Sequence, residues 1–399
     1  MQWFQNIYMN TKTMCNKIVI IGGDFHNTLG VIESFGEKGL KSNVIAYTET
    51  SWAYVLKSKY VEKGWICHTE QEIISCLINN FSKQKDKAVI IATNDQSASI
   101  IDSHFDELNQ LFIIPNTTYP GELHKIMSKE YMSSLAHSVG IDVPKMWVIN
   151  DGIIPVDVEF PCITKAISSV EGSKENIHIC KTKGELTEFL NTKAHCHTIV
   201  IQKFIDKEFE FQFLGCSLGH GKEIIIPGRT HIDRPNGIDN TYFLKFDKIE
   251  DEFSDLVTKV KEFIIKTGYQ GTFSVEFLKD KNDGKSYFTE MNFRNDGNAY
   301  CVTSAGTNLP YIYYLYNTNG DYKSEIKKST VSTTYIVPEF YYFKNMLAGE
   351  ISFKEWRKNM NLATCCTTYF KNDKLPFIWF LLQIVVHGFN RIKRRISRQ

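Results

Sequence analysis

Two glutamates and an asparagine have the residue types and the spacing of a site for a hard cation. They lie in GTFSVEFLKDKNDGKSYFTEMNFRND, residues 271–296, where an Asp-Gly pair predicts a turn between two strands. Side chains of a strand alternate between its two faces. One face of the first strand would therefore carry Thr272, Ser274, Glu276 and Leu278, and one face of the second would carry Phe288, Glu290, Asn292 and Arg294.

A turn that closes near residue 283 places Glu276 opposite Glu290. Like charges in that position are destabilising, and a cation would offset the cost. Two carboxylates and the Asn292 amide oxygen suit Mg²⁺, which takes its remaining ligands from water and nucleotide phosphates. Arg294 could hold the same anions as a bidentate donor. The alternative is a solvated hairpin face. We favour the metal site because the other face predicts a core: Phe273, Val275, Phe277 and Met291.

This pattern, an acid followed fourteen positions later by Glu-x-Asn-x-Arg, resembles the metal-binding end of the ATP-grasp superfamily. The resemblance covers roughly residues 120–310. Members of this superfamily include D-alanine–D-alanine ligase, biotin carboxylase and the carbamoyl phosphate synthetase large chain. The resemblance implies an α/β and α+β chain, in which a Rossmann-like N-terminal domain precedes an ATP-grasp fold whose nucleotide cleft lies between two α+β subdomains.

The apolar runs support this division. Residues 17–47 read as strand, loop, helix and strand, and 88–96 and 111–116 as two further buried strands. The Gly22-Gly23-Asp24 turn lacks GxGxxG, which disfavours a dinucleotide site. The expected parts are an N-terminal extension (1–16), a Rossmann-like domain (17–120), a lid subdomain (121–198), a large subdomain with the metal site (199–325) and a C-terminal appendage (326–399).

Composition narrows the class of protein. The net charge of +1 gives no global field for nucleic acid. The ten cysteines show no CxxC pair or metal-ligand spacing, so we expect reduced thiols in the cytoplasm.

The resemblance implies several nucleotide contacts. Lys165 ends an apolar strand, where the family has a phosphate-binding lysine, and Lys129 corresponds to the lysine that precedes the lid. Strand-end and helix-start lysines that reach into water are the alternatives. Ser173 lies in the 168–174 segment, which takes the place of the family's Gly-rich phosphate loop; a plain surface turn competes. The hinge that binds adenine through main-chain groups would be Gln202, Lys203, Phe204 and Ile205.

A glutamate beyond the hinge should bind the ribose hydroxyls. Glu208 and Glu210 both qualify, with Glu208 slightly preferred. Arg229 and Arg294 are the candidate catalytic donors for the transferring phosphoryl group, although solvated loop charge explains Arg229 as well. Further candidates for substrate contacts are Asn94 and Asp95, which could equally be turn caps, and the 296–298 segment.

Together these residues predict an ATP-dependent ligase that joins a small-molecule carboxylate to an amine through an acyl phosphate. Its cofactors would be ATP and two Mg²⁺ ions, with Mn²⁺ as a substitute. A cell-envelope or polysaccharide precursor is the speculative substrate. The alternative is a phosphotransferase for a small metabolite on the same fold. A non-catalytic nucleotide-binding module is disfavoured, because the Glu-x-Asn-x-Arg set is complete.

The C-terminus carries an apolar run, PFIWFLLQIVVHGF, followed by a basic tail. The run is shorter than the ~20 residues a spanning helix needs. One hypothesis is peripheral contact of residues 377–398 with the inner face of a membrane. The other is a helix that packs on the chain's own core or on the second subunit of a homodimer.

Overall fold

Residues 18–111 build a parallel sheet with helices on its faces. The computed structural model describes residues 16–150, 153–165, 177–192, 198–233 and 243–396. The sheet has strand order β3-β2-β1-β4, and every neighbouring pair is parallel. Its strands are β1 (Ile18–Gly22), β2 (Ser42–Tyr47), β3 (Val61–Cys67) and β4 (Val89–Ala92). The helices of this part are α1 (His26–Gly36), the 3-10 helix η1 (Tyr54–Lys57), α2 (Glu70–Phe81), α3 (Asp95–Ser103) and α4 (Phe105–Leu111).

The sequence predicted this part with one error. The strand, helix and strand expected over residues 17–47 are present, as is the strand within 88–96. The strand expected over 111–116 is not formed. Leu111 ends α4, and the segment forms only isolated bridges, between Ile113 and Val89 and between Asn116 and Gln270. The next residues lead into Pro115, which has no N–H to donate to a ladder.

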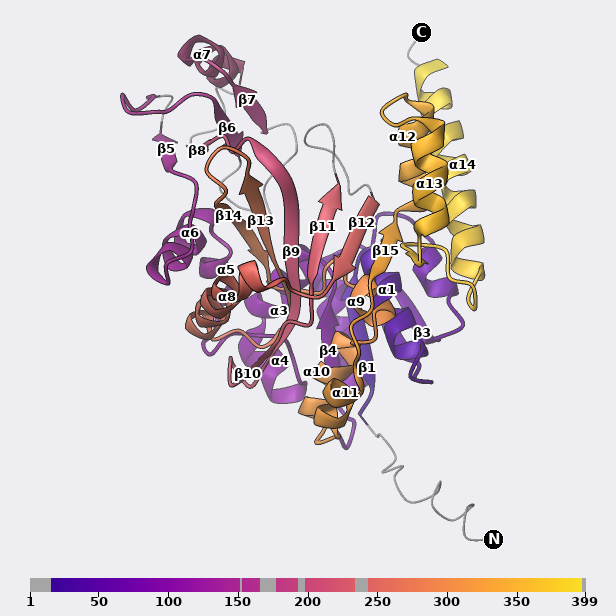
Figure 1. Cartoon of the computed structure of the whole chain (residues 1–399). Coiled ribbons are helices and arrows are strands. Elements are labelled where there is room, and N and C mark those ends of the chain that lie inside the picture. Colours follow the sequence, from indigo (N-terminus) through magenta and orange to yellow (C-terminus); the bar gives the residue numbers. More distant parts are fainter. Residues whose placement is uncertain (1–15, 151–152, 166–176, 193–197, 234–242, 397–399) are drawn as a thin grey trace.

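A second, antiparallel sheet forms the small subdomain of the middle region. Its strand order is β5-β8-β6-β7. We call this sheet, with helix α7, the lid. Its elements are β5 (Met146–Asn150), β6 (Cys162–Lys165), β7 (His178–Cys180), α7 (Lys183–Thr192) and β8 (Thr198–Lys203), and it is preceded by α5 (Glu122–Ile126) and α6 (Lys129–Ser138). In Figure 1 the lid projects from the body of the molecule at the upper left.

The third sheet is the largest and carries the predicted metal hairpin. Its order is β14-β13-β9-β11-β12-β15-β16, with β10 beside β9, and only the β15–β16 pair is parallel. The strands are β9 (Lys207–Leu218), β10 (Glu223–Ile225), β11 (Arg229–Asp233), β12 (Phe243–Asp247), β13 (Gly271–Asp280), β14 (Ser286–Asn292), β15 (Thr334–Val337) and β16 (Cys365–Cys366). Helix α8 (Ser254–Thr267), preceded by η3 (Asp251–Phe253), leads into the hairpin.

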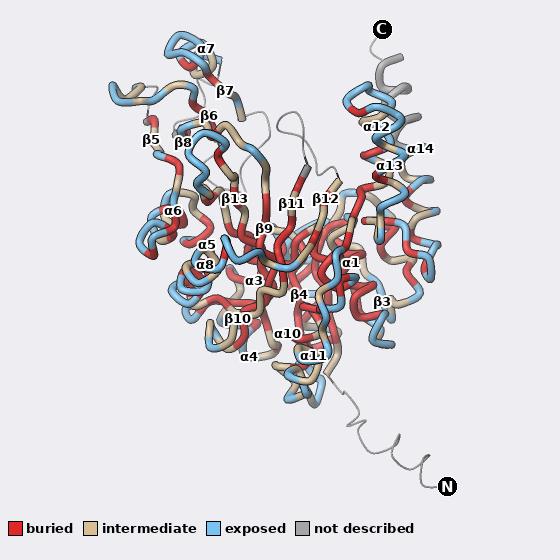
Figure 2. Tube along the Cα trace, in the orientation of Figure 1, coloured by how far each residue is buried: buried red, intermediate tan, exposed pale blue. Residues whose placement is uncertain are grey.

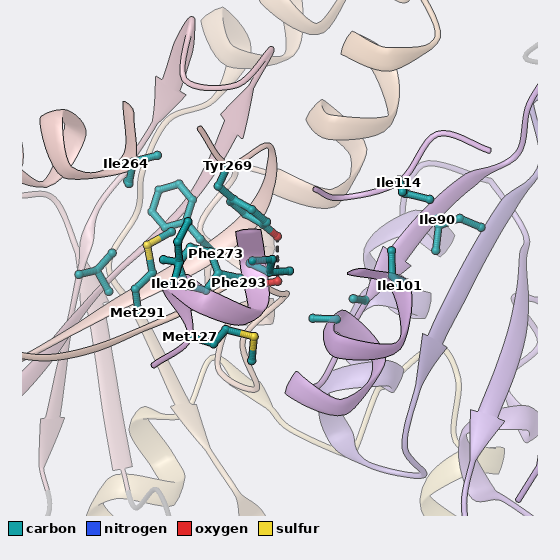
Figure 3. Packing of buried hydrophobic residues seen from close by; sticks show 14 of the residues in the cluster. Ile90, Ile101, Ile114, Ile126, Met127, Ile264, Tyr269, Phe273, Met291 and Phe293 are labelled. Carbon is teal, nitrogen blue, oxygen red and sulfur yellow. Dashed lines mark hydrogen bonds between the residues drawn. The ribbon is translucent and has the colours of Figure 1, made fainter. Parts of the chain in front are cut away.

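Buried apolar side chains join the parallel sheet to the large sheet. One core cluster includes Ile90 of β4 together with Phe273 of β13 and Met291 of β14. In Figure 3 Phe273 and Met291 lie in one group and Ile90 in a second group opposite it, and the Tyr269 hydroxyl donates to the Phe293 carbonyl at 2.9 Å. Figure 2 shows the same burial as a continuous interior through both sheets. Because the two sheets share this core, the loops of one sheet have a fixed position relative to the loops of the other.

The remaining helices follow the metal hairpin. They are α9 (Tyr300–Ser304), α10 (Leu309–Asn317), α11 (Tyr322–Lys328), α12 (Glu339–Leu347), α13 (Phe353–Leu362) and α14 (Leu375–Ile396). Figure 1 shows α12, α13 and α14 gathered at the upper right, near the C-terminus. Within the described residues, none of the helices combines the length and the apolar content that crossing a bilayer requires. The mixed α/β class predicted from the sequence is confirmed.

Candidate functional site

A cleft of about 390 Å³ opens between the lid and the large sheet. It brings together residues that are up to 161 positions apart in the chain. Eight residues singled out from the sequence line it: Lys129, Gln202, Lys203, Phe204, Ile205, Glu210, Glu276 and Glu290. The cleft has an apolar end, with Ile163, Ile179 and Leu278, and an acidic end at the hairpin. An apolar slot that leads to fixed charges suits a base linked to phosphates.

The acidic end is formed by the hairpin of β13 and β14. Glu276 and Glu290 are direct cross-strand partners, as the sequence predicted. Gln212 of β9 and Asn292 of β14 both donate to Glu276 Oε1, at 2.9 and 3.0 Å. Burial, together with the Glu290 and Asp296 charges, raises the pKa of Glu276 to about 8, although Arg294 and the Gln212 hydrogen bond oppose the shift. Without a cation this carboxyl therefore keeps its proton at neutral pH.

Asn292 is buried beside this pair, and its orientation identifies the atom that could bind a cation. Its Nδ2 donates to Ser274 Oγ at 3.1 Å as well as to Glu276. The Oδ1 atom is then the one that remains for a metal. Among the described residues, no three His, Cys, Asp or Glu side chains are grouped as a metal site. Two carboxylates and one amide oxygen are few protein ligands, which suits an ion that takes the rest from water and phosphates.

One detail of the predicted hairpin is wrong. The register shifts between Glu276 and Phe277, so that Phe277 pairs with Phe288 and Thr289 is the additional residue. This β-bulge moves Phe288 to the opposite face from Glu290. Phe288 is buried in the core with Phe273, Val275, Phe277 and Met291. The core expected on that face is thus confirmed, with Phe288 as a further member.

Arg294 links the metal hairpin to the parallel sheet. Its Nε donates to Asp95 Oδ1 at 3.1 Å, and its Nη1 donates to Asp296 Oδ2 at 3.0 Å. Asp296 also accepts from Ser274 Oγ at 3.0 Å. Two carboxylates hold the guanidinium, so Arg294 presents a fixed orientation. Its predicted position close to the anion site is consistent with these contacts.

Asp95 lies at the carboxyl edge of the parallel sheet, directly after β4. Its neighbour Asn94 caps α3 and accepts from Ser97 N at 2.7 Å, so the cap alternative holds for Asn94. His26, which follows β1, faces the same place. Burial lowers the pKa of His26, whereas Asp296 raises it and Arg294 lowers it. The chain order reverses between β1 and β4, and ligands bind at such switch points in parallel sheets.

The Asp296-Gly297-Asn298 segment completes this region. Asn298 Nδ2 donates to Gln212 Oε1 at 3.2 Å, and its N–H donates to Asp296 Oδ1 at 2.8 Å. A Cβ on Gly297 would lie 2.8 Å from His26 Nε2 and 3.0 Å from Asn27 Oδ1, so a larger residue would require these side chains to shift. A continuous set of hydrogen bonds thus runs from Asp95 to Glu276.

The predicted hinge lies at the end of β8, at the apolar end of the cleft. The N–H groups of Lys203 and Phe204 donate to Lys145 O and Pro161 O, at 2.8 and 3.0 Å. Within the described part of the chain, the Ile205 N–H has no recorded backbone acceptor. It is therefore the hinge donor that an adenine could use.

The structure distinguishes the two ribose candidates. Glu210 lines the cleft, whereas Glu208 is exposed and does not. The register between β9 and β13 shifts where Asp280 pairs with Lys207, and Glu208 falls at this irregularity, outside the ladder. Lys207 forms an ion pair with Glu210. These positions favour Glu210, against the slight preference for Glu208.

The prediction that Arg229 is a catalytic donor is corrected by the structure. Arg229 pairs with Phe213 of β9, so its side chain lies on the face opposite Gln212. It is buried and makes two hydrogen bonds to Glu250, at 2.9 and 2.6 Å, and its guanidinium lies 4.5 Å from the centre of the Phe253 ring. Arg229 therefore holds the β11 end of the sheet to the loop before α8.

The two predicted phosphate-binding lysines lie at the start of α6 and at the end of β6. Lys129 is the first residue of α6 and lines the cleft. Lys165 is the last residue of β6, where it pairs in register with Val200. Ser173 and the 168–174 segment lie outside the described residues, as does the 234–242 segment.

Sequence reasoning missed two residues of this site. Gln212 orients Glu276, and it shares a strand face with Glu210, so alternation along β9 could have identified it. His26 follows the first parallel strand, where the switch-point rule for such sheets points to ligand contacts.

The chain is similar to known ligases in sequence and in fold. No family model matches the chain. It is 21% identical to the D-aspartate ligase of Enterococcus faecium (strain Aus0004) over 410 residues, which cover 93% of this chain and 94% of that ligase.

Solved structures of other proteins have a similar fold. The L-amino acid ligase from Bacillus licheniformis aligns with a TM-score of 0.62 at 15% identity, over 80% of this chain and 79% of that one. The biotin carboxylase domain of the Hydrogenobacter thermophilus 2-oxoglutarate carboxylase, solved with MgADP and bicarbonate, aligns with a TM-score of 0.58 at 17% identity, over 76% and 70%. The chain has the ATP-grasp fold, and the resemblance predicted from the sequence is confirmed at this level.

Proposed function

We propose that this chain is an ATP-dependent ligase that forms an amide bond between a small-molecule carboxylate and an amine. The observation that carries the proposal is the direct pairing of Glu276 with Glu290 at the acidic end of the cleft. Two half-buried carboxylates that face each other cannot both ionise without cost, and a cation that binds nucleotide phosphates would offset that cost. The relatives described above are ligases with the same fold.

The cleft residues divide into three groups by position. The hinge ending at Ile205 would bind adenine, and Glu210 would bind the ribose hydroxyls. Lys129 and Lys165 would hold the phosphates. Glu276, Glu290 and Asn292 would bind Mg²⁺, with Mn²⁺ as a substitute, and two ions are expected. When bound, the metal neutralises charge on the transferring phosphoryl group.

The chemistry follows from this placement. A carboxylate oxygen of the first substrate attacks the γ-phosphorus of ATP, the bond to the β,γ-bridging oxygen breaks, and ADP leaves. The acyl phosphate carbonyl carbon is then attacked by the amine nitrogen, which loses a proton as phosphate departs. Arg294, fixed by Asp95 and Asp296, is in place to bind an anionic group of the substrate. No covalent enzyme intermediate is needed, so positioning and charge carry the rate.

The site between His26, Asp95 and Arg294 fits a substrate that carries both charges. The Arg294 guanidinium suits a carboxylate, and the Asp95 carboxylate suits an ammonium group. An amino acid has both. D-aspartate is the first substrate to test, because a D-aspartate ligase aligns with nearly the whole chain. A precursor of the cell envelope or of a polysaccharide is the proposed partner in the amide bond.

The proposal extends to organisation and location. We propose that residues 17–120, 121–198 and 199–325 act as a Rossmann-like substrate domain, a lid and a metal-binding subdomain, with 326–399 as an appendage. The protein would work in the cytoplasm, where ATP is available, and would contact the inner face of the membrane peripherally; a homodimer is the competing arrangement.

An isotope experiment tests the reaction. The protein is incubated with Mg-ATP, a panel of amines and D-aspartate labelled with ¹⁸O in its carboxylates, followed by other labelled amino acids. The proposal predicts ADP, an amide product and one ¹⁸O atom in the released phosphate. A stable phosphorylated product without an amide would identify a phosphotransferase instead. ADP formation with unlabelled phosphate would contradict the acyl phosphate route.

A further inference from the structure

The outward face of α14 is almost entirely apolar over residues 375–386. Leu375, Ile378, Leu382 and Val385 are 50, 50, 48 and 53% exposed. Their spacing of three and four residues places them along one side of the helix. Leu381 and Val386 flank this strip, and both are exposed. We call these six residues the α14 strip.

The inward face of the same helix is apolar as well, with one polar exception. Gln383 is the one polar side chain between residues 375 and 386, and it points inward to donate to Asp24 at 2.8 Å. Phe380 and Trp379 pack against Tyr54 and Trp52, with ring centres 5.2 and 5.4 Å apart. A surface helix normally places its apolar side inward and its polar side in water. Over residues 375–386 the α14 helix is instead apolar on both its inward and its exposed side, so its exposed side lacks the polar residues expected of a surface helix.

The neighbouring helices extend the apolar surface. Phe343 and Leu347 of α12 and Phe353 of α13 are exposed, and Phe340 of α12 packs on Phe380 of α14 with ring centres 5.7 Å apart. Among the described residues, twelve of the seventeen exposed large apolar side chains lie between residues 341 and 386. Figure 2 shows how much of these helices is exposed. A concentration of this kind marks an interaction site.

Positive charge is concentrated in the same part of the sequence as the exposed apolar side chains. Residues 340–399 contain eleven Lys and Arg but only three Asp and Glu, a net charge of +8. Because the whole chain has a net charge of +1, the preceding 339 residues carry −7. The basic residues include five that follow the α14 strip, namely Arg391, Lys393, Arg394, Arg395 and Arg398. The apolar surface thus belongs to the positively charged part of an otherwise acidic protein.

We propose that the α14 strip and the exposed side chains of α12 and α13 dock on an anionic lipid bilayer. The apolar side chains would enter the boundary between headgroups and acyl chains, and the basic residues would contact the headgroups. The helix would lie in the plane of the surface, since no described helix can span a membrane. A second copy of the chain fits this surface less well, because two parts of charge +8 would have to meet.

Vesicle flotation of the full-length protein tests the proposal. We expect the wild type to float with vesicles of phosphatidylcholine and phosphatidylserine, to stay behind with phosphatidylcholine alone, and to lose binding in high salt. The double variant Ile378→Glu and Leu382→Glu should lose roughly tenfold or more in vesicle affinity. The control is Ile265→Glu on α8, where the wild-type side chain is 54% exposed and belongs to no such surface; its binding should be unchanged.

A charge variant keeps the test decisive if the apolar variant fails to fold. Replacing Arg391, Lys393, Arg394 and Arg395 by Gln leaves the strip intact and should weaken anionic-vesicle binding, while nucleotide binding and circular dichroism stay as in the wild type. Wild-type protein that does not float with anionic vesicles would overturn the proposal. So would a wild-type dimer, seen by light scattering, that the double variant converts to a monomer while wild-type vesicle binding is absent; a second copy would then cover the strip.

Discussion

Glu276 and Glu290 face each other directly across neighbouring antiparallel strands, and burial raises the pKa of Glu276 to about 8. Two carboxylates held together in this way store an electrostatic cost that a bound cation removes. The pair therefore links the stability of the empty protein to the metal that the cleft is proposed to bind.

The raised pKa predicts how stability depends on pH. Folded Glu276 keeps its proton up to a pKa of about 8, whereas in the unfolded chain it loses it near its ordinary value of 4.5. The folded state thus binds more protons in this window, and the free energy of unfolding of the metal-free protein should fall as pH rises through it. Urea unfolding between about pH 5 and pH 9 measures this slope. Glu276→Gln should flatten it; an unchanged slope in the variant would show that another group is responsible.

The lysines and Arg294 should differ in their effect on nucleotide binding. Lys165→Ala should weaken ADP binding roughly tenfold, because the lysine would contact phosphates in the ground state. Arg294→Ala should change nucleotide affinity less than Lys165→Ala does, and it should reduce turnover more. The reason is that Arg294, held by Asp95 and Asp296, is proposed to bind the substrate and not the nucleotide. Calorimetric titration compares the two. Equal affinity of wild type and Lys165→Ala would remove Lys165 from the site.

Arg229 should behave as a structural residue. Arg229→Ala removes a buried bidentate ion pair with Glu250 and contact with Phe253, and should lower the free energy of unfolding by about 2 kcal/mol. Turnover per folded molecule should remain close to that of the wild type. Glu250→Gln serves as the matched control and should be milder, because Glu250 is about half exposed. A loss of turnover at full stability would restore Arg229 as a catalytic candidate.

The ribose contact can be assigned by sugar discrimination. Glu210→Gln should reduce the preference for ADP over 2′-deoxy-ADP by roughly tenfold, because a hydrogen bond to a charged acceptor is lost. Glu208→Gln should leave this preference unchanged, since Glu208 is exposed and lies outside the cleft lining. The reverse pattern would reassign the contact to Glu208.

The hairpin illustrates what the sequence can predict. Strand alternation and the Asp283-Gly284 turn were sufficient to pair Glu276 with Glu290, and Gly284 has the positive φ of +70° that such a turn favours. The β-bulge that moves Phe288 into the core was missed. It depends on one additional residue, Thr289, whose type carries no signal for it.

Long-range register explains the other differences. The face on which Arg229 lies depends on its pairing with Phe213, and no local pattern around Arg229 specifies that partner. Gln212 reaches Glu276 from 64 positions away, through the β9–β13 ladder. The strands of the hairpin and β1, β2 and β4 were recognisable from the sequence, whereas β3 and the order of strands in the large sheet were not.

The metal dependence of nucleotide binding tests the central claim most directly. The protein is titrated with ADP in the presence and absence of Mg²⁺, for the wild type and for Glu290→Gln. The variant should fold at least as stably as the wild type, because it removes the Glu290 charge that opposes ionisation of Glu276. We predict that Mg²⁺ tightens ADP binding to the wild type and that this effect disappears in Glu290→Gln, while Mg²⁺-free binding is unchanged. Glu290→Gln that retains the full Mg²⁺ effect would contradict the assignment of this pair as the metal site.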